Sequence, residues 1–253
     1  MLGHRDYCSG WLANAGCNPG ALASLFAKIR RMISLSLLKR LLRNRSRTIP
    51  QPAPVATNGP SVLNVGGGSK QIPIPEYFSG WAHLLLDVDP AGQPDIVCDA
   101  VDLGQLAGEQ FDAIYCSHNL EHYYQHDGAT VLRGFLHLLK PDGFAEIRVP
   151  DLNCVMKRLV ETGMDIEDVL YQSAAGPITV RDVIYGWGKQ IESSGVDFYA
   201  HKTGFTNKSL ATALAAAGFQ LVRIDERQES FELRALAFKR EPTAQHRVML
   251  GLA

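Results

Sequence analysis

The segment from Ser117 to His126, SHNLEHYYQH, combines imidazoles and a carboxylate at spacings that suit metal binding or proton transfer. His118 and His122 are four residues apart, and Glu121 precedes the second of them. On a helix, this H-x-x-E-H spacing is typical of inverted zinc hydrolases. An imidazole beside a carboxylate also suits a general base near neutral pH. The segment raises three hypotheses: metal ligands, a general base or substrate contact, or a pair of side chains that only fixes a loop.

The elements around this segment place it at the end of a strand rather than inside a helix. It directly follows FDAIYCS, an apolar run that predicts a buried strand. Six further runs also predict strands: SVLNV from Ser61, His83–Asp89, Asp95–Asp99, Phe144–Pro150, Gln220–Glu226 and Phe231–Lys239. Helical spacing of apolar residues predicts helices over 128–140 and 206–219, and PDG at 141–143 predicts a turn. This alternation predicts a Rossmann-like, doubly wound α/β fold with a mostly parallel seven-stranded sheet and an antiparallel last strand.

Three strand ends carry residues that suit a nucleoside. In an open parallel sheet, ligands bind at the carboxyl ends of the strands. Gly66, Gly67 and Gly68 follow the first strand, where the lack of a Cβ lets backbone amides approach a ligand closely. Asp87 ends the second strand and can accept both hydroxyls of a ribose, and Asp99 ends the third and can accept an adenine amino group. Together these ends predict an adenosine site.

The loop after the first strand argues against a dinucleotide. The pattern G-x-G-x-x-G lacks its third glycine here, because the run continues as Ser69-Lys70-Gln71. Pro73 and Pro75 also block the helix whose N-terminus would bind a pyrophosphate. We therefore expect a cofactor without phosphates.

The motifs taken together resemble a class I S-adenosylmethionine-dependent methyltransferase over about residues 61–240. The segments that carry the resemblance are NVGGGS, LLLDVDP, CDAVDL, FDAIYCSHNLEHY, LLKPDGFAEIRVPDL and HKTGFTNKSLATALAAAGF. Within that class, the chain resembles bacterial predicted methyltransferases with a GW…D-x-D pattern followed by LEH, L-K-P-x-G and VPD motifs. The resemblance implies an enzyme of class EC 2.1.1.- with S-adenosylmethionine as its cofactor.

The resemblance also implies roles for individual residues. It places the cofactor against Asn64, Gly66, Gly67, Gly68, Asp87, Asp89, Asp99, Ala100 and Ser117. The glycines would line the methionine part and Asp87 would hold the ribose, with Asp89 at the adenosine edge. Asp99 and the backbone of Ala100 would hold adenine, and Ser117 would face the methionine moiety or the transferred methyl group.

Two positions depart from the pattern of the family. An acid usually stands two residues before the first glycine, where this chain has Asn64, which would leave the cofactor's ammonium group with a neutral partner. Gly67 replaces the usual central Cys or Ser of the loop. These departures motivate an alternative in which the fold binds cofactor or a partner without turnover.

The three hypotheses for the histidines remain open. LEH occurs in methyltransferases that bind no metal, and we expect no metal here. Some quinone-pathway O-methyltransferases do bind a metal at E-x-x-E-H, the position of His118-x-x-Glu121-His122. A metal-dependent hydrolase acting through His118 and His122 is the other alternative. The candidate catalytic residues are His122, His118 and His201, the last of which lies in a segment that would cover the substrate.

Charge and composition divide the chain. Residues 1–60 contain nine Lys or Arg and one acid, whereas the remainder contains 16 basic and 25 acidic residues. We expect a basic amphipathic arm at 1–47, a Pro-rich linker at 48–60, the methyltransferase domain at 61–240 with its substrate cover at about 151–205, and a tail at 241–253. The helix expected over residues 22–47 packs on protein in one interpretation and contacts an anionic membrane surface in another.

The expected activity is methylation of an oxygen, or else a nitrogen, of a small molecule or glycan. Scattered cysteines, odd in number, fit a reducing compartment. With no apolar run long enough to span a bilayer and no secretory-signal pattern, we expect a cytoplasmic protein, with or without peripheral membrane contact. We expect no nucleic-acid partner.

Overall fold

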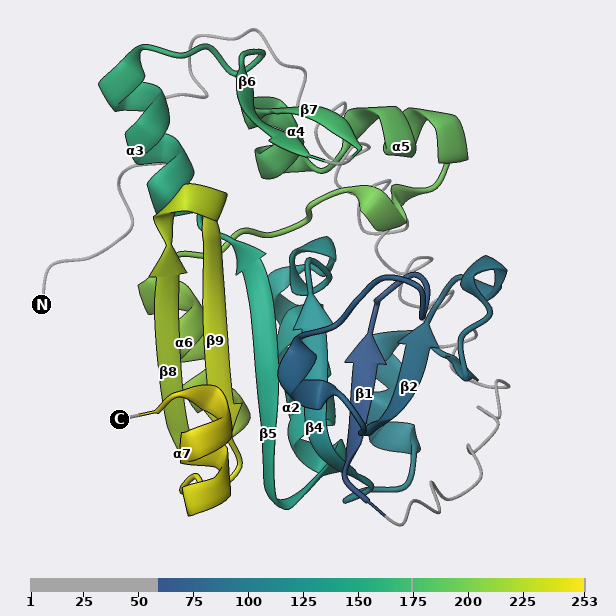
Figure 1. Ribbon diagram of the computed structural model, residues 1–253. Helices are drawn as coiled ribbons and strands as arrows, with labels where there is room; N and C mark the ends of the chain where they lie inside the picture. Colours follow the sequence, from purple (N-terminus) through teal and green to yellow (C-terminus); the bar gives the residue numbers. More distant parts are fainter. Residues whose placement is uncertain (1–58, 174, 253) are drawn as a thin grey trace, which may run out of the picture. The chain divides into compact units, whose positions relative to one another are not determined.

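The computed structural model describes residues 59–252 except residue 174. Its main sheet has seven strands: β1 (Ser61–Val65), β2 (Ala82–Asp87), β3 (Ile96–Val97), β4 (Phe111–Ser117), β5 (Leu139–Pro150), β8 (Leu221–Arg227) and β9 (Glu232–Phe238). They run in the order β3-β2-β1-β4-β5-β9-β8 (Figure 1). Only the pairs that include β9 are antiparallel. The predicted seven-stranded Rossmann-like sheet with an antiparallel last strand is confirmed.

Most strand boundaries lie within two residues of the expected ones, but β3 and β5 differ more in length. β3 has only two residues, because Asp99 instead begins a short 3-10 helix, η3 (Ala100–Gln105). β5 begins at Leu139 rather than at Phe144, so residues 141–143, expected as a turn, lie within the strand. The register of β5 against β4 shifts between Phe111 and Ala113, and this irregularity accommodates the extra residues.

Two helices cover one face of the sheet. They are α2 (Gln125–Leu138) and α6 (Asn207–Ala217), whose buried residues include Phe135 and Leu214 (Figure 1). Thr206 caps the start of α6, and Gly218, with φ 110°, ends it as the sequence predicts. Both helices contribute to the largest apolar core, which also takes in side chains from β1, β4, β5 and β9.

The opposite face is covered by shorter elements. After the glycine loop the chain forms only a three-residue 3-10 helix, η1 (Glu76–Phe78), as the prolines predict. Residues of the expected tail form α7 (Ala244–Leu250), whose Leu250 packs with Phe78, Phe144 and Phe238. The carboxyl ends of the strands therefore stay free of a long helix on this side.

An insertion lies above these strand ends, between β5 and α6 (Figure 1). It contains α3 (Leu152–Thr162), the hairpin of β6 (Val169–Ser173) and β7 (Gly176–Thr179), α4 (Val180–Tyr185), α5 (Gly188–Ser194) and η5 (Asp197–Tyr199). The hairpin was not expected. Val155, Val180, Val183 and Phe231 form a separate small core under it. We call residues 151–205 the cover segment.

The basic arm and most of the linker fall outside the described residues, so the helix expected over residues 22–47 and its membrane contact remain predictions. Within residues 59–173 and 175–252, no helix combines the length and apolar character needed to cross a bilayer.

Candidate active site

The glycine loop and the end of β2 are joined by direct hydrogen bonds. Gly66 and Gly68 adopt φ values of 72° and 66°, in the left-handed region that glycine enters without strain. The Gly68 amide donates to Oδ2 of Asp87 over 3.0 Å, and the Asp89 amide donates to Oδ1 of the same carboxylate over 2.9 Å. The Asp87 carboxylate is therefore fixed against the loop, at the place where the sequence predicts a ribose contact.

Two other predicted acids lie at neighbouring positions but act locally as caps. Asp89 accepts from the Ala91 amide over 2.9 Å and caps η2 (Pro90–Gly92). Asp99 accepts from the Val101 amide over 3.2 Å and caps η3, placing Ala100 at the first position of that turn. Parallel pairing of Asp87 with Val97 brings the Asp87 and Asp99 ends to the same edge of the sheet.

A cleft of about 310 Å³ opens beside the glycine loop. Asn64 and Gly66–Gly68 line it from β1, and Ser117 and His118 line it from the end of β4. The structure therefore brings together the predicted methionine-side residues. Asp87, Asp99 and Ala100 are not among the residues that line this cleft.

The SHNLEHYYQH segment does not form the helix that a zinc hydrolase motif requires. His118 has a φ of 49°, an unusual value for a residue other than glycine, and donates its amide to Arg148 O. A single 3-10 turn, η4 (Leu120–His122), follows it. His118 and His122 thus do not present one face of an α-helix, which argues against the hydrolase interpretation.

His118 lies between two carboxylates. Its Nε2 is 3.1 Å from Oε2 of Glu232, and its Nδ1 is 3.5 Å from Oε1 of Glu121. Burial would lower the pKa of His118, but the pairings with Glu121 and Glu232 outweigh it and raise the pKa to about 10. His118 therefore carries a positive charge at neutral pH, although half of its side chain is exposed to solvent.

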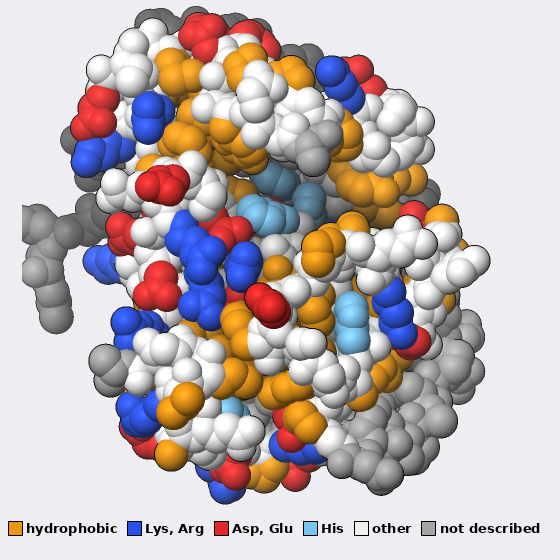
Figure 2. Space-filling model, in the orientation of Figure 1, with side chains coloured by type: hydrophobic (Ala, Val, Ile, Leu, Met, Phe, Trp, Pro, Cys, Tyr) orange, Lys and Arg blue, Asp and Glu red, His pale blue; other side chains and the backbone are white. Residues whose placement is uncertain are grey.

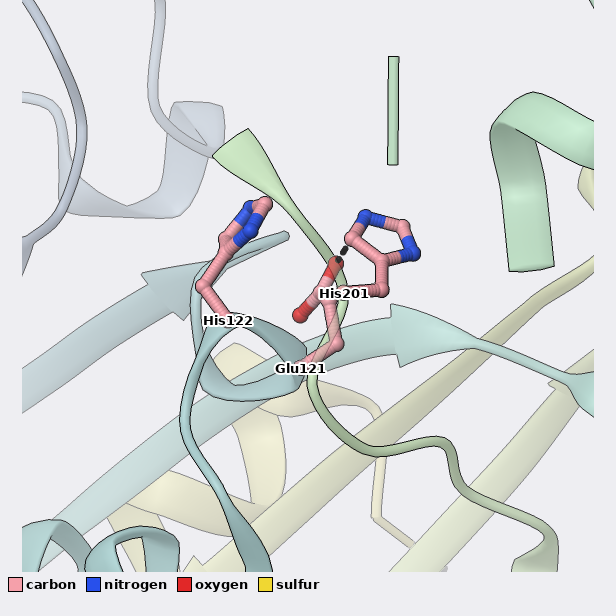
Figure 3. Close-up of side chains that lie close together, drawn as sticks. All are labelled: Glu121, His122 and His201. Atoms are coloured by element: carbon pink, nitrogen blue, oxygen red, sulfur yellow. Dashed lines mark ion pairs between the residues drawn. The ribbon is translucent and has the colours of Figure 1, made fainter. Parts of the chain in front are cut away.

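Glu121, His122 and His201 form a second group, which we call the imidazole cluster (Figure 3). One ligand atom from each of the three side chains lies within 4.8 Å of the other two. The His122 and His201 rings meet edge to face with their centroids 4.9 Å apart. The Lys202 and Thr203 amides both donate to Glu121 O, which holds the end of the cover segment against η4. In Figure 2, histidine side chains gather in the hollow below the cover segment.

Contacts with backbone carbonyls indicate which ring nitrogen carries a proton in His122 and in His201. His201 Nδ1 lies 2.9 Å from Val183 O, and His122 Nδ1 lies 3.2 Å from Ala200 O. Because a carbonyl oxygen only accepts, each Nδ1 carries a proton, and either ring, when neutral, has its lone pair on Nε2. Burial lowers the pKa of His201, which keeps this ring neutral near pH 7.

Comparison with known proteins places the chain in a family. A family model described as a methyltransferase domain matches residues 15–224, which is more than half of the chain. The chain belongs to this methyltransferase family. A search of curated proteins found no match.

Solved structures similar to this methyltransferase include three with low sequence identity. One is a possible exported protein from Bordetella parapertussis (15% identity, 73% of this chain, 63% of that one, TM-score 0.43), so this chain spans less than two thirds of it. Another is the 1,6-didemethyltoxoflavin-N1-methyltransferase of Burkholderia thailandensis with bound 1,6-didemethyltoxoflavin and S-adenosylhomocysteine (20%, 72% and 72%, 0.42). A third is an S-adenosylmethionine-dependent methyltransferase from Mesorhizobium loti (17%, 70% and 90%, 0.46).

The cleft fits the polar end of S-adenosylmethionine, the cofactor expected for this methyltransferase. Asn64 is buried, and its Oδ1 atom has no hydrogen-bond partner among the described residues. A buried acceptor without a donor is costly, and the cofactor's ammonium group would supply that donor. The neutral Asn64 is therefore compatible with the cofactor, despite its departure from the usual acid.

Sequence reasoning missed several residues of this site in the methyltransferase. Ile72, Pro73 and Ile74 line the cleft from the segment after the glycine loop, and Tyr115 lines it from β4. The phenol of Tyr123, next to His122, interacts with Asp99, and burial raises its pKa. The strict alternation along β4 marks Tyr115 and Ser117 as neighbours on one face of the strand, and this signal could have identified Tyr115.

Proposed function

We propose that this methyltransferase methylates a hydroxyl oxygen of a small molecule or glycan, with the imidazole cluster as the acceptor of the hydroxyl proton. The observation that carries the proposal is the pair of imidazoles, His122 and His201, whose Nδ1 atoms face backbone carbonyls and leave Nε2 to accept a proton. A hydroxyl nucleophile gains reactivity when its proton has a nearby acceptor, whereas a neutral amine attacks with its own lone pair. The cluster therefore favours oxygen over nitrogen.

In this proposal, the residues at the strand ends bind the cofactor and the imidazole cluster accepts the proton. Bound S-adenosylmethionine supplies a sulfonium methyl group for in-line displacement. Asp87 would bind the ribose, Asp99 and Ala100 would bind adenine, and Asn64 would bind the ammonium group. Ser117, at the end of β4, would face the methionine moiety or the transferred methyl group. The acceptor oxygen would take the methyl group as the carbon–sulfur bond breaks, its proton would pass to the cluster, and S-adenosylhomocysteine would leave. Positioning of the two reactants supplies much of the rate enhancement.

His118 takes a different part from the other two histidines. Because it is protonated between Glu121 and Glu232, it is a poor base at neutral pH. We assign it to positioning: its charge holds Glu121 in place at the edge of the cleft. His122, with an Nε2 lone pair and a contact to the cover segment, is the better candidate for direct proton transfer.

The cover segment supports a polar acceptor. Lys202 lies with its Nζ 5.9 Å from the centroid of the Tyr124 ring, and Tyr124 is exposed. Aromatic faces and a cation at one opening suit sugars and other hydroxylated or anionic compounds. The N-terminal arm would bring the enzyme to an anionic membrane surface in the cytoplasm, and flotation with liposomes, with and without residues 1–50, tests that part. We propose no nucleic-acid substrate.

The test is a screen for S-adenosylhomocysteine production over matched hydroxyl and amine acceptors. Turnover with hydroxyl compounds, reduced about 100-fold or more in His122→Ala, supports the proposal. Turnover with amines alone, or a His122→Ala variant with the wild-type rate, would contradict it.

A further inference from the structure

We propose that the imidazole cluster binds one divalent transition-metal ion through Glu121, His122 and His201. Residue types alone do not carry this inference, because acids and histidines often cluster without an ion. Three features of the cluster carry it: a buried carboxylate without hydrogen bonds, two imidazoles with fixed tautomers, and the distances among the ligand atoms.

The carboxylate of Glu121 lacks the donors that burial normally demands. The side chain is 1% exposed, and neither carboxylate oxygen has a hydrogen-bond partner among the described residues. His118 Nδ1 at 3.5 Å and His201 Nε2 at 4.0 Å both lie beyond a normal hydrogen-bond distance from Oε1. A buried charge is kept when it is paired or coordinates a metal. Glu121 thus has room for a stronger partner than the one ion pair with His118.

The imidazoles are arranged as metal ligands commonly are. A ligating histidine usually donates its other ring N–H to a carbonyl or carboxylate, which fixes its orientation. His201 does so through Val183 O and His122 through Ala200 O. The His201 Nε2 atom lies 4.0 Å from Glu121 Oε1, so a cation bound between them would contact both atoms after a small shift.

The distances allow an ion to join the three groups. Ligand bonds of about 2.0–2.2 Å place neighbouring donor atoms roughly 3 to 4 Å apart around an ion. The three candidate donor atoms lie within 4.8 Å of one another, so a contraction of about 1 Å completes the set. Two imidazoles and one carboxylate favour a first-row transition metal over Mg²⁺ or Ca²⁺.

The proposed ligands come from two parts of the chain that must meet for the ion to bind. Glu121 and His122 lie on η4, next to the cleft-lining His118, whereas His201 lies at the end of the cover segment. An ion held by three protein groups keeps further positions open, and these would accept the hydroxyl of the acceptor. Such binding would make the hydroxyl more acidic, and its proton would then pass to solvent instead of to the imidazoles; this part of the inference rests on the proposed function.

Ion binding is tested independently of methyl transfer. The full-length chain, with its affinity tag removed and stripped with EDTA, is titrated with Co²⁺ while its visible absorption is followed, and Zn²⁺ is then added as a competitor. We expect one Co²⁺ per chain, displaced by Zn²⁺. Affinity should fall about 10-fold or more in His201→Ala and Glu121→Gln. The control variant His126→Ala removes a histidine that is largely exposed and outside the cluster, and it should bind as the wild type does.

Two results would overturn the inference: no absorption change with Co²⁺, or a Co²⁺ affinity that is the same in His201→Ala and His126→Ala. If Glu121→Gln does not fold, His201→Ala and His122→Gln carry the comparison, with thermal melting of each metal-free variant as the check on folding. The screen for S-adenosylhomocysteine production, repeated on the same metal-free protein, separates the two proposals. Turnover of hydroxyl compounds without Co²⁺ binding would reject the ion alone.

Discussion

Gly67 lies so close to the side chain of Asn64 that a Cβ atom at position 67 would come within 2.2 Å of the Asn64 Nδ2 atom. The usual Cys or Ser of this loop would therefore collide with Asn64. The two departures from the family pattern are thus coupled: the side chain of Asn64 occupies the space that the absent Cβ at position 67 leaves.

This relationship predicts the effect of Gly67→Ala. The added methyl group must displace Asn64, which turns the Oδ1 acceptor away from the cleft. We expect S-adenosylmethionine affinity to fall about 10-fold or more and the free energy of unfolding to fall by about 1–3 kcal/mol. Calorimetry and denaturant titration measure the two effects. Gly104→Ala is the matched control, because a Cβ there meets no atom within 4 Å. Equal cofactor affinities for the two variants would contradict the coupling.

The substitution Asn64→Asp should raise the affinity for S-adenosylmethionine and lower the stability of the free protein. A carboxylate would give the cofactor's ammonium group a charged partner, so we expect about 10-fold tighter binding, equivalent to about 1.4 kcal/mol. Because Asn64 is buried, the same charge lacks a partner in the free protein, and the melting temperature without cofactor should fall. Weaker cofactor binding by Asn64→Asp would show that the ammonium group lies elsewhere.

A buried ionic network under the site predicts a stability effect. Glu146 on β5 is fully buried, accepts from Arg234 over 2.9 Å and from Arg148 over 2.7 Å, and also accepts from the Tyr77 hydroxyl. Glu146→Gln leaves both guanidinium groups short of a charged partner. We expect a loss of about 3–5 kcal/mol in the free energy of unfolding. Asp225→Asn, which removes an exposed partner of Arg234, should cost less than about 1 kcal/mol.

The same network predicts a dependence of stability on acid pH. Burial alone would raise the pKa of Glu146, but hydrogen bonds from Arg234 and Tyr77 outweigh it and hold the pKa below its ordinary value of 4.5. A carboxyl group whose pKa is lower in the folded state stabilises fully above pH 4.5, and this contribution is lost as the pH falls further. Below pH 4.5, the stability of Glu146→Gln should fall less steeply than that of the wild type. Parallel curves for the two proteins would contradict this account.

The sheet and the loops at its strand ends were predictable because their signals are local. Continuous apolar runs mark each strand, and a parallel sheet places all their carboxyl ends at one edge. Gly66–Gly68 and Asp87 could therefore be assigned to one site from sequence, and the hydrogen bond between Gly68 and Asp87 joins them.

Other features depend on contacts between distant segments. The meeting of His201 with Glu121 depends on the path of the cover segment, which is fixed by backbone hydrogen bonds that leave no mark on residue type. Glu146 on β5 accepts a hydrogen bond from Arg234 on the neighbouring strand β9. The sequence around Glu146 is mostly apolar and gives no sign of this ion pair. No residue of the β6 and β7 strands is fully buried, so the hairpin lacks the apolar pattern that predicts a strand.

The most direct test of the account is calorimetric titration of the full-length protein with S-adenosylmethionine, alongside Asp87→Ala and the surface control Glu161→Ala. The account predicts saturable binding of one cofactor per chain. Asp87→Ala should weaken it about 100-fold, because two charge-assisted hydrogen bonds to the ribose are lost. Glu161→Ala should bind like the wild type. No binding at millimolar cofactor, or an unchanged affinity in Asp87→Ala, would contradict the site described here.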